Sequence, residues 1–524
     1  MPTAVAVAVL GDEGLAAARR PWAGIVREQP AGADRWGGEA GPVAGWERSL
    51  EVEDLGDGRH RVTQRTTYQL DLPFFAWLFA LPTRRELRRL PLRGSPPWWA
   101  PTEALDRQAA RAVCALCILS MASGYLGTLL TQTITFAGEE FGVGPGGQGV
   151  ALAVSRVDLV LAFSAVALAD RLGRRRVLAV AVVVAVAFTA AGALTPSLPL
   201  LIASQVPSRG LTAAMNLVIG VHAAEEVPAH ARAWTAGVLT LVNALGAGVC
   251  VLTLPVADLG VRGWRLSYVV PVLFLPLVLL AARRLPESRR FLRSQASGGR
   301  RRPSTASGGA RPGDGAPRLR GHGGRLGMLA GGGFLAATFV NPAAQLQNTF
   351  LRDERGFSAL RITVFTLLTG TPAGIGVVAG GRLAERGRRA VGAVGLVVGT
   401  ILVVLAYLAV GWPLWALGIV AGIFSAATVP ALGVYGPELF PTAVRGRANG
   451  VISIAARAGA VTGLLAAGLL STRLGGLGPA LAVLAAGPLL LAVLVVTCYP
   501  ETAARELEDL NPEDLPVLPA PPTT

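Results

Sequence analysis

The sequence predicts an all-α polytopic membrane protein, with twelve transmembrane helices in two pseudo-symmetric halves of six. Hydrophobic residues make up 52% of its 524 residues, charged residues make up 15%, and the mean hydropathy is +0.50. Soluble domains are less apolar and more charged than this. From residue 111 onward, long apolar runs follow one another, and a helix needs about 20 residues to cross the hydrocarbon core. Short motifs that follow spans in the first half also follow spans in the second.

Residues 1–110 are mostly polar and are predicted to form a cytoplasmic N-terminal region. Its first apolar run, residues 4–10, is too short and wrongly flanked for a signal peptide. Residues 49–54 and 59–70 lie on either side of a glycine-rich turn, which predicts a β-hairpin. An aromatic apolar segment at residues 73–81 precedes a cluster of arginines, a pattern typical of an interfacial helix in the headgroup plane of an anionic leaflet. A helix that packs only on the protein's own cytoplasmic face would have the same pattern.

Twelve apolar runs are long enough to be transmembrane helices. Six of them form a first half at residues 111–284, and six form a second half at residues 326–500. The intervening residues 285–325 are rich in Gly, Ser, Pro and Arg, cannot bury a core, and are predicted to be a flexible cytoplasmic linker. Residues 501–524 are predicted to be a cytoplasmic tail. The predicted spans are residues 112–136, 147–169, 177–195, 198–222, 233–256, 266–283, 326–348, 361–380, 390–410, 412–435, 448–470 and 478–499.

The arginines give the predicted orientation. Every basic residue other than the four histidines is Arg, and the formal net charge is +15. Most of the arginines after residue 111 lie in alternate loops between spans, and the positive-inside rule places such loops in the cytoplasm. Both termini are therefore predicted to be cytoplasmic, in a multi-pass protein of the cell membrane. Because the arginines indicate topology rather than a continuous phosphate-binding face, no nucleic-acid partner is expected.

The sequence carries no pattern of a metal site or of an enzyme. Cys114 and Cys117 have CxxC spacing but lie in an apolar run without a second ligand pair, and the four histidines are scattered. No phosphate-binding G-x-x-x-x-G-K-[ST] motif is present. We therefore expect no metal, no cofactor and no enzymatic activity, and we expect an ion or substrate gradient to supply the energy.

Two loop motifs recur at corresponding ends of the two halves. Residues 225–232, of the form E-x-x-P-x-x-x-R, follow the fourth span, and the same spacing recurs at residues 438–445 after the tenth. The tripeptide P-E-S at residues 286–288 follows the sixth span and recurs as P-E-T at residues 500–502 after the twelfth. Duplicated halves with a substrate site between them are the arrangement that alternating access requires.

A charged loop between the second and third predicted spans carries a family resemblance. Residues 169–176 have the sequence A-D-R-L-G-R-R-R, and a version one residue shorter recurs at residues 381–389. The loop resembles the G-x-x-x-D-R-x-G-R-R loop of the major facilitator superfamily of secondary transporters, with Val166 at the leading glycine position. Residues 435–446 and the P-E-S tripeptide are similar to the sugar-porter and organic-ion (metabolite:proton symporter) branch. The resemblance covers roughly residues 110–510 and implies the major facilitator fold; a loop that serves only as a positive-inside anchor is the alternative.

The resemblance implies a gating network at the cytoplasmic rim. A carboxylate and an arginine in neighbouring loops can hold helix ends together while both stay solvated. By resemblance, these charges would hold the outward-open state and rearrange as the halves rock, without touching the substrate. The residues implied are Asp170, Arg171, Gly173, Arg174, Glu225, Arg232, Glu385, Arg389, Glu438 and Arg445.

Substrate-binding residues are expected near the membrane midplane, where a charged side chain costs about 2.5–3.5 kcal/mol and needs a reason. In the seventh span, Asn341, Gln345 and Asn348 form a polar stripe at i, i+4 and i+7. The candidate substrate-binding and proton-binding residues are Arg156, Asp158, Arg209, Asn341, Gln345, Asn348 and Arg457. Three other polar residues are either further ligands or interhelical hydrogen-bonding groups, namely Gln132, Thr135 and Asn243.

The charges at the midplane favour an anionic, carboxylate-like substrate, because three arginines lie there against the single Asp158. The sugar-porter branch carries a paired glutamine in its seventh span, whereas a leucine separates Gln345 from Gln347 here, which argues against a sugar. In the family that the loop resembles, the second span packs against the eleventh across the halves, and this resemblance implies that Asp158 pairs with Arg457. A carboxylate paired with Arg stays ionised and an isolated one takes up a proton, so this pair would couple protons to transport; a permanent structural ion pair is the alternative.

The sequence therefore predicts a secondary transporter of a small organic solute, coupled to protons and working by alternating access, with import slightly favoured over export. Its expected partners are the substrate, protons and the lipid bilayer, and we expect a monomer. Two alternatives stay open. One is an exporter of hydrophobic drugs or cations with the same fold, and the other is a non-transporting membrane scaffold or sensor that acts through residues 1–100.

Overall fold

The computed structural model describes residues 1–92, 95–97, 99–101, 103–157, 168–169, 172–287 and 322–503. Three predicted site residues, Asp158, Asp170 and Arg171, lie outside these ranges, as do most of the predicted linker and tail. For Arg445, only the backbone is described.

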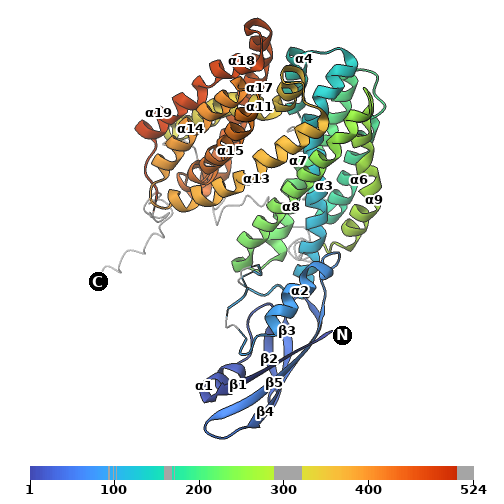
Figure 1. Ribbon diagram of the computed structural model, residues 1–524, viewed down its shortest axis with the longest axis vertical. Coiled ribbons are helices and arrows are strands. Elements are labelled where there is room, and N and C mark those ends of the chain that lie inside the picture. Colours follow the sequence, from blue (N-terminus) through green and yellow to red (C-terminus); the bar gives the residue numbers. More distant parts are fainter. Residues whose placement is uncertain are drawn as a thin grey trace, which may run out of the picture.

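A separate N-terminal domain precedes the helical bundle (Figure 1). Its five strands form one antiparallel sheet in the order β1-β5-β4-β3-β2. The elements are β1 (Thr3–Gly11), α1 (Asp12–Ala18), β2 (Arg27–Gly32), β3 (Arg35–Ala40), β4 (Val43–Asp54), β5 (Arg59–Leu70) and α2 (Ala76–Leu87). The two segments of the predicted hairpin lie in β4 and β5, which pair with each other. The apolar residues 4–10, for which the sequence predicts no element, lie in β1.

The core of this domain contains a buried ion pair. Arg48 Nη2 lies 2.7 Å from Glu28 Oε2, and both side chains are almost fully buried. Arg48 also donates to the carbonyl oxygens of Ala18 and Arg20. Its guanidinium lies 4.0 Å from the centroid of the Trp36 ring. A buried ion pair is tolerated when its remaining hydrogen-bonding groups are satisfied, and these contacts satisfy them.

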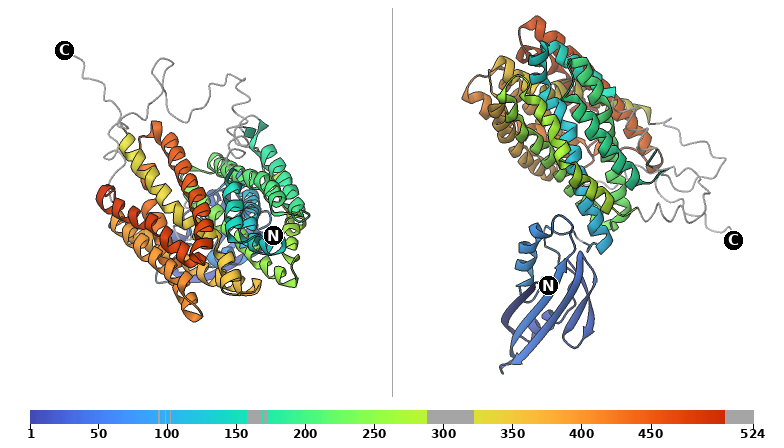
Figure 2. Two further views of the ribbon diagram at one scale, coloured as in Figure 1. Left: turned by 90° about the horizontal axis from the view of Figure 1, so that it is seen from above. Right: turned by 90° about the vertical axis from the view of Figure 1, so that its right-hand side faces the viewer.

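Helices dominate the rest of the described chain and form two groups (Figure 1, Figure 2). The first half contains α3 (Arg107–Phe141), α4 (Pro145–Val154), α6 (Arg174–Gly192), α7 (Leu198–Glu226), α8 (Arg232–Thr253) and α9 (Leu266–Arg284). The second half contains α11 (Gly323–Gln345), α12 (Gln347–Thr349), α13 (Ala359–Ala384), α14 (Arg388–Leu408), α15 (Trp412–Leu432), α16 (Tyr435–Glu438), α17 (Thr442–Leu474), α18 (Leu477–Leu484) and α19 (Ala486–Cys498). Short 3-10 or π segments are η1 (Ser155–Val157), η2 (Ala229–Ala231), η3 (Leu254–Leu259), η4 (Gly263–Arg265) and η5 (Phe350–Glu354).

Within the described residues, ten helical segments are long and apolar enough to span a membrane. The fourth predicted span lies in α7, a continuous helix that is not among the ten. The second predicted span begins with α4 and runs into residues 158–167, which are not described. The prediction of an all-α bundle in two halves is therefore confirmed, while the count of twelve stays a prediction.

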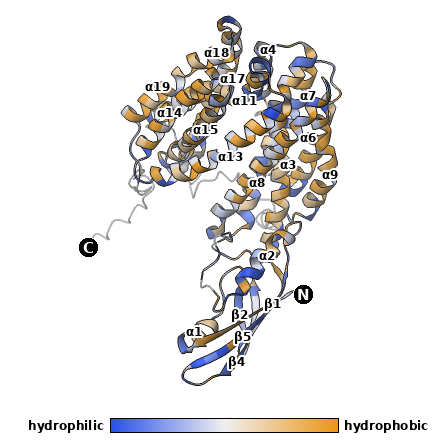
Figure 3. Ribbon diagram, viewed as in Figure 1, coloured by the Kyte–Doolittle hydropathy of each residue, from blue (hydrophilic) through white to orange (hydrophobic). Residues whose placement is uncertain are grey.

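The helices of the bundle consist mostly of hydrophobic residues (Figure 3). Leu273, Ile375 and Val429 are 73%, 63% and 63% exposed, and many other aliphatic side chains of the spans are exposed as well. A soluble protein rarely leaves such a large apolar surface in water. In a bilayer these side chains contact lipid tails, as the hydropathy of the sequence predicts.

The first span shows how local sequence shapes these helices. α3 begins before the predicted span because Asp106 caps it: Asp106 Oδ1 accepts a hydrogen bond from the Ala109 N–H at 2.7 Å. It ends at Gly142, which has φ of 66° and so adopts a left-handed conformation that favours glycine. At Gly124, a Cβ would lie only 1.9 Å from the carbonyl oxygen of Asn243 in α8. The absence of a side chain at Gly124 therefore lets α3 and α8 pack closely, as small residues do in membranes.

Candidate functional site

Charged residues cluster at the end of the bundle that faces the N-terminal domain, which we call the proximal end; the opposite end is the distal end (Figure 1). Arg174 begins α6, and its Nη2 lies 2.8 Å from Oε1 of Glu225 near the end of α7. Glu287 Oε1 accepts hydrogen bonds from the backbone N–H groups of Arg174 and Arg175, at 3.0 and 3.4 Å. A carboxylate at a helix N-terminus satisfies free N–H groups and complements the helix dipole. The cluster thus holds three segments of the first half together.

The same arrangement recurs in the second half. Arg388 begins α14, and its guanidinium pairs with the carboxylate of Glu438 in α16. Glu501 accepts hydrogen bonds from the backbone N–H groups of Arg388 and Arg389, at 3.1 and 3.2 Å. Arg389 is the residue that the family resemblance implies for the gating network, but the side chain that meets Glu438 is that of Arg388. The guanidinium of Arg389 donates to the backbone carbonyl of Val496 instead. Burial opposes ionisation of the Glu501 carboxyl, but hydrogen bonds from backbone N–H groups hold its pKa below the ordinary value for glutamate.

The remaining predicted gating residues lie around these clusters. Gly173 precedes α6 with φ of 96°, a conformation that suits glycine. Arg232 begins α8 and Glu385 follows α13, and both are exposed. Among the described residues, neither Arg232 nor Glu385 forms an ion pair.

A chain of polar side chains crosses between the halves in the middle of the bundle. Arg156, which follows α4, donates from Nη2 to Oδ1 of Asn341 in α11 at 3.0 Å. Gln345 Nε2 donates to the same oxygen at 3.3 Å. Gln345 is buried, and its Oε1 has no hydrogen-bond partner in the described part of the chain. The sequence prediction that Asn341 and Gln345 share a face therefore agrees with their positions, and Arg156 is the partner from the other half.

A second polar layer lies one turn closer to the distal end. Asn348 Nδ2 donates to the backbone carbonyl and to Oε1 of Gln132, both at 2.9 Å. The hydroxyls of Thr135 and Thr349 lie 2.8 Å apart, and Thr349 donates to Gln148 Oε1 at 2.7 Å. Gln148 and Thr349 are not among the residues predicted from the sequence. Both are polar residues at the ends of apolar runs, and they meet only across the contact between the halves. Gln148 Nε2 also donates to the backbone carbonyl of Val143 within the first half, at 3.0 Å.

The other predicted polar residues have different surroundings. Arg209 donates from Nη1 to a backbone carbonyl of α3 at 3.1 Å, within the first half. Asn243 donates to another α3 carbonyl at 3.0 Å, which agrees with the interhelical alternative. Arg457 is half-buried on α17. Because Asp158 lies outside the described residues, its pairing with Arg457 stays a proposal.

The distal ends of the halves are held together by polar contacts. Arg352 Nη2 lies 3.2 Å from Oε2 of Glu139 at the end of α3. Asp258 of the first half accepts hydrogen bonds from the N–H groups of Ala359 and Leu360, at 2.8 and 3.0 Å, and thereby caps α13 of the second half. Between described residues of the two halves, hydrogen bonds lie in the middle and at the distal end, and the ribbons diverge toward the proximal end (Figure 1). The bundle is therefore closed at its distal end.

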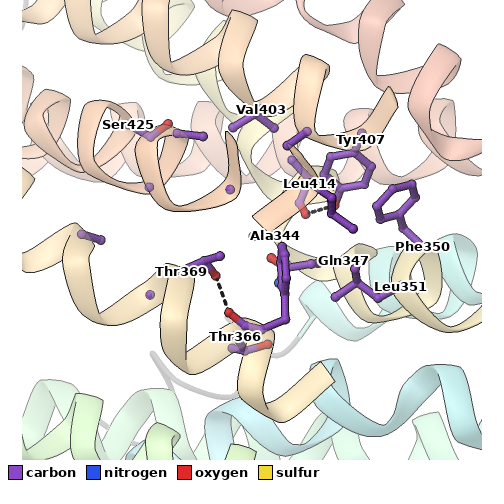
Figure 4. Close-up of a pocket in the computed structure, with 18 of the residues that line it drawn as sticks. Ala344, Gln347, Phe350, Leu351, Thr366, Thr369, Val403, Tyr407, Leu414 and Ser425 are labelled. Atoms are coloured by element: carbon purple, nitrogen blue, oxygen red, sulfur yellow. Dashed lines mark hydrogen bonds between the residues drawn. The ribbon is translucent and has the colours of Figure 1, made fainter. Parts of the chain in front are cut away.

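A cavity of about 330 Å³ lies within the second half, between α11–α12 and the helices α13, α14 and α15 (Figure 4). Its lining is mostly apolar and aromatic, with Gln347, Thr366, Thr369 and Ser425 as polar members. Gln345 and Gln347 lie on either side of Leu346, where α11 ends. Gln345 therefore belongs to the interface between the halves, while Gln347 lines the cavity.

Solved structures with the same fold are transporters. The chain is similar to a bacterial homologue of the human lysosomal transporter Spinster, at 17% identity over 74% of this chain and 94% of that one, with a TM-score of 0.57. It is similar to the nucleoside transporter NupG, at 12% identity over 74% and 100% of the two chains, with a TM-score of 0.59. It is also similar to the xylose transporter XylE from E. coli, at 16% identity over 76% and 98%, with a TM-score of 0.59. At these identities the similarity shows the fold alone.

The sequence itself shows the family. No curated protein matches the chain. The sequence profile described as Major Facilitator Superfamily matches residues 112–360 and again residues 326–522. These matches include both helical halves and leave out the N-terminal domain, in agreement with the resemblance of the loop at residues 169–176. The chain therefore belongs to the Major Facilitator Superfamily, and it is a membrane transporter rather than an enzyme.

Proposed function

We propose that this protein is a secondary active transporter that moves a small organic anion, coupled to protons, by alternating access. The observation that carries the proposal is the hydrogen-bonded chain from Arg156 through Asn341 to Gln345, which crosses between the halves. When one half rocks against the other, this chain must break and form again. A ligand bound at these three side chains therefore has different affinities for the two arrangements of the halves. Such a difference is the condition for coupling binding to movement.

The side chains of this hydrogen-bonded series, Arg156, Asn341 and Gln345, favour an anionic substrate. The planar guanidinium of Arg156 matches the geometry of a carboxylate, and Asn341 Oδ1 now accepts its hydrogen bond. A substrate carboxylate would replace Asn341 as the acceptor. The buried Oε1 of Gln345, which has no partner among the described residues, would accept a hydrogen bond from a hydroxyl or amide of the same substrate. We therefore infer that a carboxylate with a neighbouring donor group fits this position best.

We propose that the proximal end lies in the cytoplasm and the protein in the cell membrane, because the arginine-rich loops favour that side. In that orientation the described conformation is closed on the outer side and faces inward. The clusters at Arg174 and Arg388 lie within single halves here. By resemblance to the family, Asp170 and Arg171, which lie outside the described residues, would join the rims of the two halves in the outward-facing state.

Proton coupling is proposed to depend on Asp158 and Arg457. A carboxylate that loses its arginine partner in a low-dielectric interior takes up a proton. If opening of the halves separates this pair, proton uptake accompanies each transport cycle. The protein would then accumulate substrate against its gradient, and import is the slightly favoured direction.

The proposal is tested by ligand-induced thermal stabilisation and by counterflow exchange in proteoliposomes. Carboxylates, sugars and organic amines are screened, since a ligand raises the unfolding temperature of the state that it binds. We expect a carboxylate to bind, and Arg156→Gln to weaken its binding by about 10- to 100-fold, the effect of losing a hydrogen bond to a charged group. The control is Arg473→Gln, at the exposed end of α17, which should leave the affinity unchanged. Binding of amines or sugars alone would contradict an anionic substrate.

A second function is favoured by the folded N-terminal domain, which lies outside the residues that match the family. The protein would then be a membrane scaffold or sensor in which this domain binds the partner. Transport is compared between the full chain and a variant without residues 1–100. Accumulation of substrate by the shortened protein would exclude a non-transporting scaffold, and exchange that is lost only in the shortened protein would favour a regulatory domain.

A further inference from the structure

Helix α2, which joins the N-terminal sheet to the bundle, leaves a large apolar surface uncovered. The exposed fractions of Trp77, Leu78 and Leu81 are 76%, 51% and 57%. Leu81 is four positions after Trp77 and three positions after Leu78, so the three residues lie on one side of the helix. An aromatic and two aliphatic side chains gathered in this way mark a surface that binds something apolar.

The same side of the helix becomes cationic toward its end. Four exposed arginines follow the apolar residues, at Arg84, Arg85, Arg88 and Arg89. Residues 77, 81, 84 and 88 are spaced by one helical turn each, so the apolar and cationic parts form one continuous face. The face therefore changes from apolar to positively charged along the helix axis.

The opposite side of α2 is fixed on the sheet, so the exposed face cannot turn inward. Thr83, Glu86 and Leu87 are buried. Gln64 of β5 donates from Nε2 to the backbone carbonyl of Leu87 at 3.2 Å, and Leu87 belongs to the core of the N-terminal domain. Residues on the outer face are therefore presented to whatever surrounds the domain.

The start of α2 lies at the level where the spans end. Asp71 precedes the helix, and its Oδ2 lies 2.8 Å from Nη2 of Arg111. The carboxylate of Asp71 also pairs with Arg107, at the beginning of α3. Phe74 packs against the hydrophobic core of the first half, and the guanidinium of Arg284, the last residue of α9, lies 5.6 Å from its ring centroid. Arginines at the ends of membrane spans mark the boundary between lipid and water. The apolar part of the exposed face is therefore close to that boundary.

The carboxylate in this attachment is charged at neutral pH. Burial opposes ionisation of Asp71, but hydrogen bonds from Arg107 and Arg111 hold its pKa below the ordinary value for aspartate. The carboxylate thus stays charged and keeps the N-terminal end of α2 against the bundle.

We propose that the exposed face of α2 binds the surface of the bilayer in which the protein's own spans lie. Trp77, Leu78 and Leu81 enter the headgroup layer. Arg84, Arg85 and Arg88 contact the phosphates of anionic lipids, while Arg89 pairs with Glu86 at 2.9 Å. The order of residues matches the membrane profile, because the apolar ones lie next to the spans and the cationic ones lie farther out. The N-terminal domain is then held at the membrane by two attachments, one to α3 and one to lipid.

The test measures where α2 lies in the full-length protein in lipid nanodiscs. The four native cysteines are replaced, and a spin label is attached at Leu81→Cys, or at Leu78→Cys as a second site. The control is Val7→Cys on β1, whose side chain is 61% exposed and so resembles Leu81 at 57%. Collisions with oxygen, which partitions into lipid, are compared with collisions with a water-soluble nickel chelate, in phosphatidylcholine discs with and without phosphatidylglycerol.

We expect the α2 label to collide more with oxygen than with the nickel chelate, and the difference to grow when phosphatidylglycerol is present. The Val7 label should show the reverse preference in both kinds of disc. Substitution of Arg84, Arg85 and Arg88 by Gln should remove the dependence on phosphatidylglycerol without changing the unfolding temperature. Nickel access at Leu81 equal to that at Val7 would place α2 in water and overturn the proposal. Protection of Leu81 from both reagents would show that protein covers the face, and would overturn it as well.

Discussion

At the scale of single residues, one side chain, Asn341, accepts hydrogen bonds from both halves. Asn341 accepts hydrogen bonds from Arg156 of the first half and from Gln345 of its own helix. Substrate and Asn341 therefore compete for the same donors in the proposed function. Hydrogen bonds to a shared acceptor can be broken and formed again at a low cost in free energy, because one hydrogen bond is exchanged for another.

At the residue scale, Asp353 is expected to make the stability of the distal contact depend on pH. Burial and the nearby charge of Glu139 raise its pKa to about 6. An acid whose pKa is higher in the folded than in the unfolded chain, where it is about 4, binds its proton more tightly when folded. The stabilisation is therefore complete below about pH 4 and is lost as the pH rises through about 6.

The measurement is the free energy of unfolding in detergent between pH 4 and 7. Asp353→Asn should remove a decrease of about 1 kcal/mol, a small value because Asp353 is exposed and solvent screens its interactions. Glu385→Gln, an exposed residue at the proximal end, should leave the decrease in place. An unchanged pH dependence in Asp353→Asn would show that another group is responsible.

At the scale of elements, the starts of α6 and α14 are built in the same way. In each, the first residue is an arginine that pairs with a glutamate, and a second glutamate caps the backbone N–H groups. The loops that supply these residues are the motifs that recur in the sequence. The repetition shows that the internal symmetry extends from sequence to contacts.

We expect Arg174→Gln to lower the free energy of unfolding by about 3 kcal/mol, because the largely buried carboxylate of Glu225 loses its ion pair with Arg174. Arg388→Gln should have a similar effect through Glu438. The matched control is Arg175→Gln: the side chain of Arg175 is exposed and its contact with Glu287 is made by the backbone, so the change should be within about 0.5 kcal/mol. Thermal or denaturant unfolding in detergent measures all three. Equal losses in Arg174→Gln and Arg175→Gln would mean that the ion pair contributes little.

At the scale of the whole molecule, the contact between the halves at the distal end must open during transport. The hydroxyls of Thr135 and Thr349 lie 2.8 Å apart across this contact. The hydroxyls of Thr189 and Ser208 lie 2.7 Å apart within the first half. The two pairs are equally close and equally buried, but only the first joins parts that move relative to each other in alternating access.

Cysteines are therefore introduced at each pair in a protein freed of its native cysteines. Oxidation of Thr135→Cys with Thr349→Cys should abolish exchange of substrate, and reduction should restore it. Oxidation of Thr189→Cys with Ser208→Cys should leave most of the exchange intact. Exchange that continues when the first pair is fully cross-linked would contradict rocking of the halves about this contact.

Much of this architecture could be predicted from the sequence because the responsible physics is local. A run of about 20 apolar residues must form a helix in lipid, where backbone groups can bond only within their own segment. The asymmetry of the arginines and the recurring loop motifs are likewise properties of short segments. They gave the membrane class, the division into two halves and the family, all of which are confirmed.

The polar site was only partly predictable. Asn341 and Gln345 share a face because helix periodicity places residues four apart together. Helix periodicity cannot show that Arg156 meets Asn341, that Thr349 meets Gln148, or that Arg388 rather than its neighbour meets a glutamate. These contacts join residues far apart in the chain, so they depend on how the helices pack.

The sequence by itself determined that the chain is a membrane transporter of two related halves, because hydrophobic length and loop charge act segment by segment. The tertiary structure decided the N-terminal sheet, in which β1 pairs with the distant β5, and the polar contacts that close the distal end. It also decided that the apolar residues of α2 remain uncovered, since only packing determines which side of a helix the protein buries. Long-range pairing of this kind depends on the sum of many weak contacts in three dimensions, and no short segment of sequence contains that sum.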